Sequence, residues 1–295
     1  MSELARSPGQ KFRDAFAAGT IAIPGVFNAL TARLAERAGF QAVYQSGASL
    51  SAGLAAVPDI GLLTATEFAT QAQYLTQAVS IPVISDADTG FGEPLAVERT
   101  VRQYEAAGLA GLHLEDQENP KRCGHLNGKT LVPTEVMVAK LLAAVAARQD
   151  PSFVIIARTD ARGVDGFDAA VGRARAYLAA GADMIFPEAL ETAAEFEAFA
   201  KAVQAPLLAN MTEFGKSPLL SLAELGAMGY AAALFPVTLF RVAMQAVETA
   251  LNQLAAEGTQ QNFVGSMQTR KRLYELLDYS DYDRRDQQYS IDAKN

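Results

Sequence analysis

The single cysteine of this chain lies in a segment whose side chains could support a reactive thiol. The segment L-E-D-Q-E-N-P-K-R-C-G-H-L-N-G-K, residues 114–129, contains Cys123 and one of only two histidines, His125. In an extended backbone successive side chains alternate, so Lys121, Cys123 and His125 would fall on one side. A thiol between two potential cations can act as a thiolate or as a proton donor. The alternative is a small buried hydrophobe, but a polar, glycine-bearing loop is a poor place to bury a thiol.

Carboxylates form a second group of residues that could do chemistry. Asp86 and Asp88 stand two apart in S-D-A-D-T-G-F-G, so they would project to the same side of a strand that continues that far. With Glu115 they would form a cluster that needs a cation, and oxygen ligands alone favour Mg²⁺ or Mn²⁺. The alternative is that Asp88 begins an Asx turn with the following threonine and glycine. Asp59, which follows a proline, is weaker evidence of the same kind.

Two further residues could belong to the same site. Arg158 lies inside the apolar segment F-V-I-I-A-R-T-D, where a guanidinium requires an anionic partner. That partner could be a substrate carboxylate or an internal ion pair with Glu188 or Asp160, and the two roles can coexist. We interpret His113, two positions before Glu115, as a hydrogen-bonded core histidine in preference to a catalytic group.

The elements that must position these residues alternate regularly along the chain. Amphipathic, alanine-rich stretches with helical spacing separate eight short apolar segments, which we predict to be strands. The predicted strands are 20–23, 41–46, 82–86, 111–115, 153–159, 183–188, 206–210 and 230–236. Such alternation implies parallel strands joined by right-handed crossovers, and eight units close into a (β/α)8 TIM barrel. A doubly wound sheet is the alternative, but no glycine-rich phosphate fingerprint follows the first strand.

Polar residues stand at the carboxyl ends of nearly all the predicted strands, which is where a barrel of this type has its active site. In chain order they are Tyr44 with Ser46 and Gly47, Asp86 with Asp88, Glu115, Arg158, Glu188 and Asn210, followed by Pro236 at the last strand. Turn-forming preferences explain the serine, the glycine and the asparagine. They do not explain several carboxylates around one opening, so we expect the active site there.

Composition excludes several classes of protein. The chain has 295 residues, of which 50% are hydrophobic and 20% charged, as in a soluble globular enzyme. A net charge of -8 and a pI near 4.9 argue against nucleic-acid binding. The single cysteine allows no internal disulfide, and residues 1–12 lack the apolar core of a signal peptide, which predicts a cytoplasmic location. The apolar stretch 230–247 contains a proline and an arginine, so we predict a barrel strand and a buried helix, not a membrane span.

The chain is expected to have two parts. The first is a barrel catalytic domain over residues 1–258, and the second is a helical extension over residues 259–295. The extension contains a predicted helix over 267–277, followed by a segment with few aliphatic residues that cannot build its own core. We expect that last segment either to dock on a neighbouring subunit or to fray in solvent.

Several motifs together resemble the isocitrate lyase and phosphoenolpyruvate mutase superfamily. They are Y-Q-S-G, S-D-A-D-T-G-F-G, L-H-L-E-D-Q, P-K-R-C-G-H, A-R-T-D-A, F-P-E-A, L-A-N-M-T-E-F-G and the closing M-Q-T-R-x-x-L-Y-E. The similarity extends from residue 7 to residue 279. The K-R-C-G-H loop is specific to the carbon–carbon lyase branch and is lacking in the phosphonate- and oxaloacetate-processing relatives.

The resemblance implies an Mg²⁺-dependent, retro-aldol-type cleavage of 2-methylisocitrate to pyruvate and succinate, a step of propionate catabolism in the methylcitrate cycle. Asp86 would be the nearest metal ligand, with Asp59, Asp88 and Glu115 acting directly or through water. The residues implied for the pyruvate half are Ser46, Gly47, Ala48 and Arg158, and those for the succinate half are Gly124, His125, Asn210 and Thr212.

The same resemblance implies roles for the groups that move protons. Cys123 would protonate the carbanion-like form of succinate, tuned by Lys121, His125 and Glu188. Tyr44 would remove the proton of the substrate hydroxyl. Members of the superfamily form homotetramers in which a carboxyl-terminal helix is exchanged between subunits, and residues 259–295 are consistent with that arrangement.

The choice of substrate rests on a few positions. The short chain and Ala48 differ from isocitrate lyases, whereas the residues that match a pocket for the substrate methyl group are Phe186, Leu234 and Pro236. The loop continues with L-N-G at 126–128 where R-P-N is common, and Gln45 replaces an apolar residue. The alternative is therefore a 2,3-dimethylmalate or other 2-alkylmalate lyase, ahead of an isocitrate lyase, a phosphonopyruvate-processing enzyme or an oxaloacetate decarboxylase.

Overall fold

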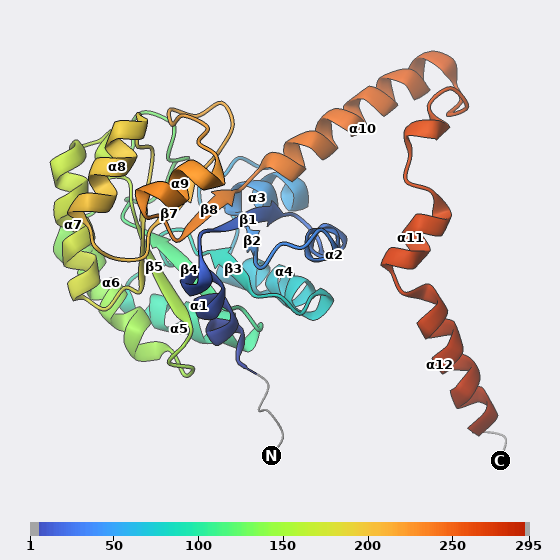
Figure 1. Ribbon diagram of the computed structural model, residues 1–295, viewed down its shortest axis with the longest axis horizontal. Helices are drawn as coiled ribbons and strands as arrows, with labels where there is room; N and C mark the ends of the chain where they lie inside the picture. The colour runs from blue at the N-terminus through green and yellow to red at the C-terminus, as the bar shows by residue number, and fades with distance from the viewer. Residues whose placement is uncertain (1–5, 293–295) are drawn as a thin grey trace. The chain divides into compact units, whose positions relative to one another are not determined.

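Eight parallel strands alternate with helices in the computed structural model, which describes residues 6–292 (Figure 1). The strands are β1 (Ile21–Val26), β2 (Val43–Gln45), β3 (Val83–Asp86), β4 (Gly111–Glu115), β5 (Val154–Thr159), β6 (Met184–Pro187), β7 (Leu208–Asn210) and β8 (Ala232–Phe235). Their order is β6-β5-β4-β3-β2-β1-β8-β7, and a parallel bridge between Ile185 and Leu207 brings the two ends of the sheet together. The predicted TIM barrel is confirmed.

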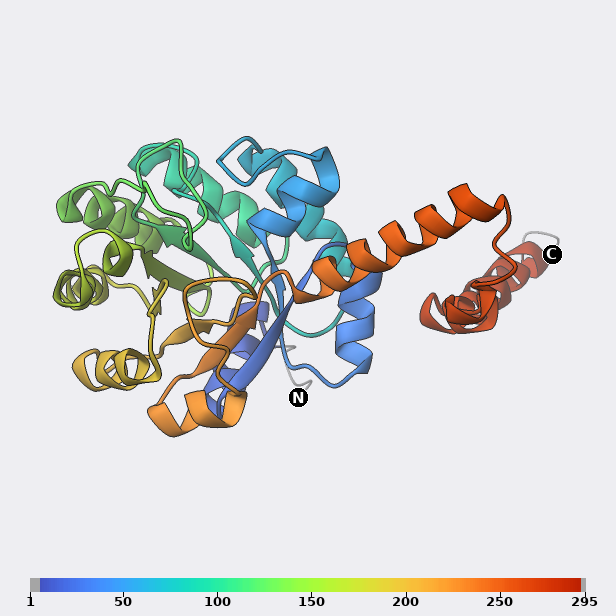
Figure 2. The same ribbon diagram turned by 90° about the horizontal axis from the view of Figure 1, so that it is seen from above.

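Helices surround the strands (Figure 2). In the barrel they are α1 (Pro8–Ala18), α2 (Ala29–Arg37), α3 (Gly47–Ala55), α4 (Ala65–Ala78), α5 (Pro94–Ala106), α6 (Thr134–Ala147), η1 (Ala161–Gly163), α7 (Phe167–Ala179), α8 (Ala193–Ala202) and α9 (Leu222–Met228). The helix α3 was not predicted, because its sequence G-A-S-L-S-A-G-L-A consists of small and apolar residues without a polar face.

Side-chain alternation along the strands divides the interior into two layers. On β5, Val154 and Ile156 pack inside the barrel, while Ile155 and Ala157 pack against the surrounding helices. Arg158 follows the inward pair, so its side chain enters the open end of the barrel. The strands β4 and β5 pair in register, which sets Glu115 opposite Arg158. The apolar interior therefore ends in a layer of charged groups.

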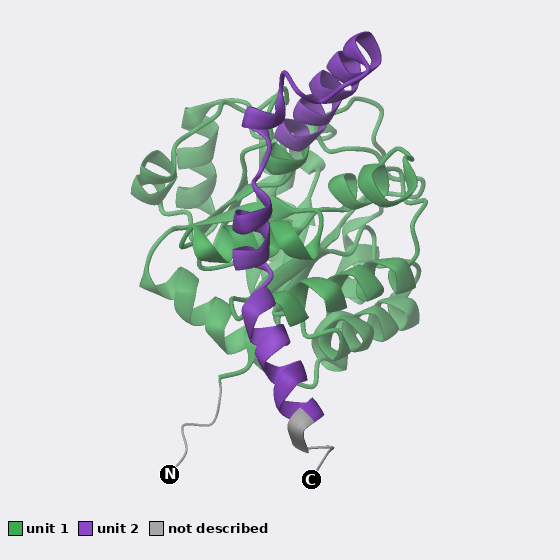
Figure 3. Cartoon of the chain, turned by 90° about the vertical axis from the view of Figure 1, so that its right-hand side faces the viewer, with its two compact units in different colours: residues 1–240 green, residues 241–295 purple. Residues whose placement is uncertain are grey.

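The last part of the chain forms a separate compact unit, residues 241–295 (Figure 3). The elements here are α10 (Thr238–Glu257), which begins just before the unit boundary, η2 (Val264–Ser266), α11 (Arg270–Leu276) and α12 (Tyr279–Asp292). The helix α10 has no buried residue, and Val242, Val247, Leu251 and Leu254 are exposed on it within the described part of one chain. The prediction of a buried helix after β8 was therefore wrong for the single chain. The domain boundary after residue 258 stays a prediction.

None of the helices within residues 6–292 is long and apolar enough to cross a bilayer. This agrees with interpreting residues 230–247 as a strand followed by a helix.

A substitution in the layer between sheet and helices tests the role of the core. Leu112 on β4 is fully buried, so Leu112→Ala should lower the free energy of unfolding by about 2–5 kcal/mol. Leu142→Ala on α6 is the matched control, because that side chain is 53% exposed and its loss should cost less than about 0.5 kcal/mol. Urea unfolding of both variants checks the difference, and equal destabilisation would contradict the assignment.

Candidate active site

Three predicted carboxylates and a lysine meet beside the end of β3. Lys121 Nζ lies 2.5 Å from Asp59 Oδ1 and 2.6 Å from Asp88 Oδ1. The strand ends at Asp86, and the backbone of Asp88 turns to a φ of 45° so that its amide donates to Asp86 Oδ1 over 2.8 Å. The expected strand-like projection of the two aspartates is therefore wrong, since a turn brings them together. Lys121 is buried among these acids and offsets part of their charge.

Burial opposes the ionisation of all these carboxylates, but their neighbouring charges give them different pKa values. It raises the pKa of Glu115 well above its ordinary value and that of Asp88 to about 7. For Asp86 burial also opposes ionisation, but His113 and Lys121 outweigh it and lower the pKa to about 2. Four carboxylates around Lys121 outweigh its own desolvation and raise its pKa, so it stays charged. The cluster thus has more acidic groups than its one lysine can neutralise.

The donor set fits a hard cation. Among residues 6–292 no group of three or more His, Cys, Asp or Glu side chains is arranged as a ready metal site. Both carboxylate oxygens of Glu115 are nevertheless buried without a hydrogen bond, and Asp88 Oδ1 has only its ion pair with Lys121. Buried carboxylate oxygens without hydrogen-bond donors are suitable ligands for Mg²⁺.

Tyr44 and His113 form a buried pair next to the carboxylates. The Tyr44 hydroxyl lies 2.8 Å from His113 Nε2 and 3.5 Å from Asp86 Oδ2. Burial lowers the pKa of His113 to about 4, so the imidazole is neutral at physiological pH. Burial and the charge of Asp86 raise the pKa of Tyr44 well above 10. His113 is a hydrogen-bonded core histidine as interpreted, but its partners are residues of the site.

Arg158 lies at the centre of the second half of the site. Its Nε is 3.0 Å from Asp160 Oδ2, and its two terminal nitrogens lie 3.5 Å from Glu188 Oε2 and 3.3 Å from Glu115 Oε2. The guanidinium carbon is 5.2 Å from the centre of the Phe186 ring. These contacts confirm the internal ion pairs that were one of the two roles considered for Arg158.

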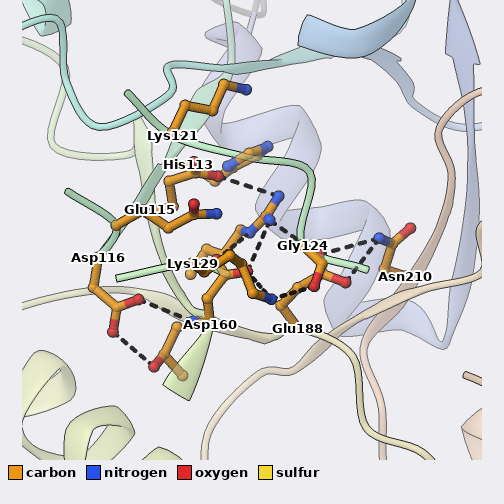
Figure 4. Close-up of polar contacts among 12 residues, drawn as sticks. His113, Glu115, Asp116, Lys121, Gly124, Lys129, Asp160, Glu188 and Asn210 are labelled. Carbon is orange, nitrogen blue, oxygen red and sulfur yellow. Dashed lines mark hydrogen bonds and ion pairs between the residues drawn. The ribbon is translucent and has the colours of Figure 1, made fainter. Parts of the chain in front are cut away.

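Glu188 connects Arg158 to the loop and to β7. The amide of Asn210 donates to it over 3.2 Å (Figure 4). His125 Nε2 lies 2.7 Å from Glu188 Oε1. Burial opposes the ionisation of Glu188, but Arg158 and His125 outweigh it and hold the pKa well below the ordinary value. Glu188 is therefore a fixed negative charge rather than an acid.

The loop carrying the thiol is turned, not extended. Leu126 N donates to Cys123 O over 2.9 Å, and the three side chains diverge. Lys121 reaches the aspartates, Cys123 is exposed, and His125 reaches Glu188. The expectation that these three side chains share one side is therefore wrong. Although the thiol is exposed, neighbouring protein atoms partly desolvate it and raise the pKa of Cys123, so it keeps its proton at neutral pH.

At two glycines of the site the backbone lies so close to a carboxylate side chain that a Cβ atom would overlap it. A Cβ on Gly124 would lie 2.6 Å from Glu188 Cδ, and a Cβ on Gly47 would lie 2.6 Å from Asp86 Oδ2. Ser46 caps α3 by accepting from Ser49 N, so the amino-terminal turn of this helix, which includes Ala48, adjoins Asp86. Helix amino termini favour anions.

The remaining predicted residues lie in less specific surroundings. Leu234 is buried in the inner core with Phe186, and the carbonyl of Pro236 accepts from Ser49. Thr212 is half-buried two residues after Asn210.

Sequence reasoning missed the buried polar residues behind the site. Lys129 Nζ donates to Gly124 O and to Asp160 Oδ1. Asp116 accepts from the Thr159 hydroxyl and from Asp160 N. Asp160 was considered only as a partner of Arg158. Nothing in the polar segment around Lys129 indicated that its ammonium is buried.

This barrel, with a loop thiol, a buried arginine and carboxylates at the carboxyl ends of its strands, defines an enzyme site for anionic substrates. Residues 12–255 match the family model described as Phosphoenolpyruvate phosphomutase, and the chain belongs to this family. Within it, the chain is 56% identical over 280 residues to a probable 2-methylisocitrate lyase 1 of Corynebacterium glutamicum, covering 94% of this chain and 92% of that protein. It is 50% identical to the 2-methylisocitrate lyase of Aeropyrum pernix, with coverage of 97% and 92%.

Solved structures agree with this family. A 2,3-dimethylmalate lyase superposes with a TM-score of 0.90 at 36% identity, covering 96% of each chain. A phosphonopyruvate hydrolase in complex with oxalate and Mg²⁺ superposes with a TM-score of 0.86 at 33% identity, covering 94% of this chain and 97% of that one. Both identities are lower than those to the 2-methylisocitrate lyases.

A glycine substitution tests whether the loop docks against the barrel as described. Gly124→Ala should displace the loop, because the added methyl group would overlap Glu188, and trypsin should cleave after the exposed Arg122 about tenfold faster. Gly172→Ala on α7 is the control, since nothing lies within 4 Å of its new methyl group. Unchanged cleavage in folded Gly124→Ala would contradict the docked position.

Proposed function

We propose that this chain is a carbon–carbon lyase that cleaves 2-methylisocitrate to pyruvate and succinate. The main support is the docking of Gly124 and His125 on the Arg158–Glu188 pair, in a chain 56% identical to a probable 2-methylisocitrate lyase. Cys123 directly precedes Gly124, so the docked loop would carry the thiol toward the carboxyl end of the barrel. A cleavage that leaves a carbanion needs a proton donor in that position.

Asp86 is the proposed nearest metal ligand, with Asp59, Asp88 and Glu115 acting directly or through water. When bound, Mg²⁺ would supply positive charge that stabilises the developing oxygen charge of an α-hydroxy acid, and Mn²⁺ could replace it. The assignment is supported by the buried oxygens of Glu115, which accept no hydrogen bond, and by the excess of carboxylates over Lys121. A family member solved with oxalate and Mg²⁺ is consistent with it.

Binding of the substrate is proposed to use the polar ends of several strands. Arg158 and the first turn of α3, with Ser46, Gly47 and Ala48, would hold the carboxylate of the pyruvate half. The residues proposed for the succinate half are Gly124, His125, Asn210 and Thr212. Phe186, Leu234 and Pro236 would accept the methyl group, consistent with the burial of Phe186 and Leu234 in the apolar inner core.

Two groups are proposed to move protons. The phenolic oxygen of Tyr44 would take the substrate hydroxyl proton while its own proton passes to Nε2 of the neutral His113, 2.8 Å away. The carbon–carbon bond breaks, its electron pair remains on the succinate carbon, and the Cys123 thiol gives that carbon a proton. The raised pKa of Cys123 supports the thiol as donor because it is protonated at neutral pH. Lys121, His125 and Glu188 would fix the geometry and charge around it.

A 2,3-dimethylmalate lyase is the second candidate. The observation that favours it is the superposition on such an enzyme with a TM-score of 0.90. Both reactions break the bond next to a tertiary alcohol carbon and leave a carbanion beside a carboxylate. The two substrates differ in the half of the molecule that Gly124, His125 and Asn210 are proposed to bind.

The oligomeric state is proposed from the C-terminal unit. A homotetramer in which carboxyl-terminal helices are exchanged would cover the exposed side chains of Val242, Val247, Leu251 and Leu254 on α10. Exposed apolar side chains along one helix indicate a surface for another protein chain. Sedimentation of the full chain measures the state directly.

The reaction is tested by measuring pyruvate release in the presence of Mg²⁺. We expect kcat/KM for 2-methylisocitrate to exceed that for 2,3-dimethylmalate and for isocitrate by at least about tenfold, because differential contacts in one pocket reach this size. Folded protein that releases no pyruvate from 2-methylisocitrate would reject the proposal. A preference for 2,3-dimethylmalate would support the second candidate.

Metal binding should depend on pH through Asp88. Its pKa near 7 means that a proton competes with the cation below that pH, so affinity should rise about tenfold per pH unit up to about pH 7 and then level off. Mn²⁺ titration followed by electron paramagnetic resonance measures this. Asp88→Asn should bind more weakly and with a flatter pH profile. An unchanged slope in the variant would contradict Asp88 as the group that titrates.

The proton donor is tested by Cys123→Ser. A serine hydroxyl is a far weaker acid than a thiol, so kcat should fall by about 10²–10⁴-fold while the fold is kept, since residue 123 is exposed. Stopped-flow measurement of pyruvate formation gives the rate. Full turnover in the folded variant would exclude Cys123 from this role.

A further inference from the structure

Lys129 is a buried lysine at the returning end of the thiol loop, and the proposed reaction does not use it. Its side chain is 2% exposed, and its ammonium lies 2.9 Å from Asp160 Oδ1 while also donating to the carbonyl of Gly124. Gly163 of η1 lies beside it, since a Cβ there would be 3.4 Å from Lys129 Nζ. A buried ammonium needs such partners, because desolvating its charge is costly. Lys129 thus connects the loop to the end of β5.

Asp160 is the barrel residue to which Lys129 binds. It accepts from Arg158 Nε over 3.0 Å and from Arg158 Nη2 over 3.2 Å, so one carboxylate holds both Lys129 and the arginine. Figure 4 draws Lys129 and Asp160 together with Gly124 and Glu188. Any shift of Asp160 would therefore move both the loop and the guanidinium.

Asp160 is itself fixed by a buried carboxylate behind it. Its amide donates to Asp116 Oδ1 over 2.9 Å. The other oxygen of Asp116 accepts from the hydroxyls of Thr159 and Tyr177, each over 2.7 Å. Arg173 NH1 lies 3.3 Å from the same oxygen. This network ties Asp160 to β4, β5 and α7, which are parts of the barrel wall.

The other described contacts of the loop lie at its base, at Lys121, which is paired with Asp59 and Asp88, and at its far tip. At the base, Gln117 bridges Leu131 and exchanges hydrogen bonds with the backbone of Arg122. At the tip, His125 contacts Glu188 and accepts from the backbone of Lys216. Between them, the carbonyl of Gly124, next to the thiol residue, receives its hydrogen bond from Lys129.

We propose that Lys129 and Asp160 are positioning residues that hold residues 123–125 in the docked position and couple the thiol to Arg158. The role in turnover rests on the proposed function, whereas the role in holding the loop does not. Because Asp160 fixes both the arginine and the ammonium, the proton donor and the carboxylate-binding group keep a set distance. A misplacement of about 1 Å in such a geometry can lower the rate about 10²-fold.

The experiment compares Lys129→Met with wild type and with Lys11→Met. Lys11 also donates from its ammonium to a backbone carbonyl, that of Ser80, but lies outside the site. We expect trypsin to cleave folded Lys129→Met after Arg122 about tenfold faster than either comparison protein. Losing one hydrogen bond to a charged group favours opening of the loop by about this factor. We also expect kcat to fall about 10²-fold. KM should change less than about threefold, because Arg158 keeps its ion pair with Asp160. Lys129→Arg, which retains the charge and the donors, should recover most of both.

The results test the role of Lys129 independently of the proposed lyase function. Cleavage no faster than in Lys11→Met, or faster cleavage with unchanged kcat, overturns it, as does an equal loss in Lys129→Arg. If Lys129→Met does not fold, Lys129→Gln, which keeps a polar terminus, is measured in its place with the same criteria. If wild-type protein releases no pyruvate, the proposed function fails, and the trypsin comparison still decides whether Lys129 holds the loop.

Discussion

The guanidinium of Arg158 is buried at the end of β5, where carboxylates must offset the cost of removing its charge from water. Asp160, Glu115 and Glu188 supply that compensation from the ends of three neighbouring strands. Each of these acids has a second task. Asp160 holds Lys129, Glu188 holds His125, and Glu115 faces the carboxylate cluster. Arg158 therefore joins the carboxylate cluster to the half of the site that holds the loop.

The balance of charge also explains why similar side chains differ in behaviour. Glu188 lies against Arg158 and His125 and stays ionised, whereas Glu115 has poorer contacts and a raised pKa. Asp86 and Asp88 differ for the same reason, because the charges around Asp86 outweigh its burial. Fixed negative charges suit orientation and cation binding, while a protonated thiol suits proton donation. The roles proposed for the site follow from these environments and not from residue type.

Much of the fold could be predicted from local pattern. The apolar segment F-V-I-I-A-R-T-D predicts a buried strand with Arg158 near its carboxyl end, and the structure has both. The helix α3 could not be predicted, because small residues without a polar face give no helical period. For α10, hydrophobicity predicted burial, but none of its side chains is buried within residues 6–292 of one chain. Apolar composition alone does not specify whether the covering surface belongs to the same chain.

For the site, the sequence by itself determined which residues could act and at which edge of the sheet they lie. Strand periodicity and parallel order are local properties, so Asp86, Glu115, Arg158 and Glu188 could be assigned to one opening. Only the tertiary structure decided the partners within it. The turn in the segment 114–129 sends Lys121 to the aspartates and His125 to Glu188, and the buried Lys129 joins Gly124 to Asp160. Those pairings depend on packing and charge compensation between residues far apart in the chain, and no spacing in the sequence encodes them.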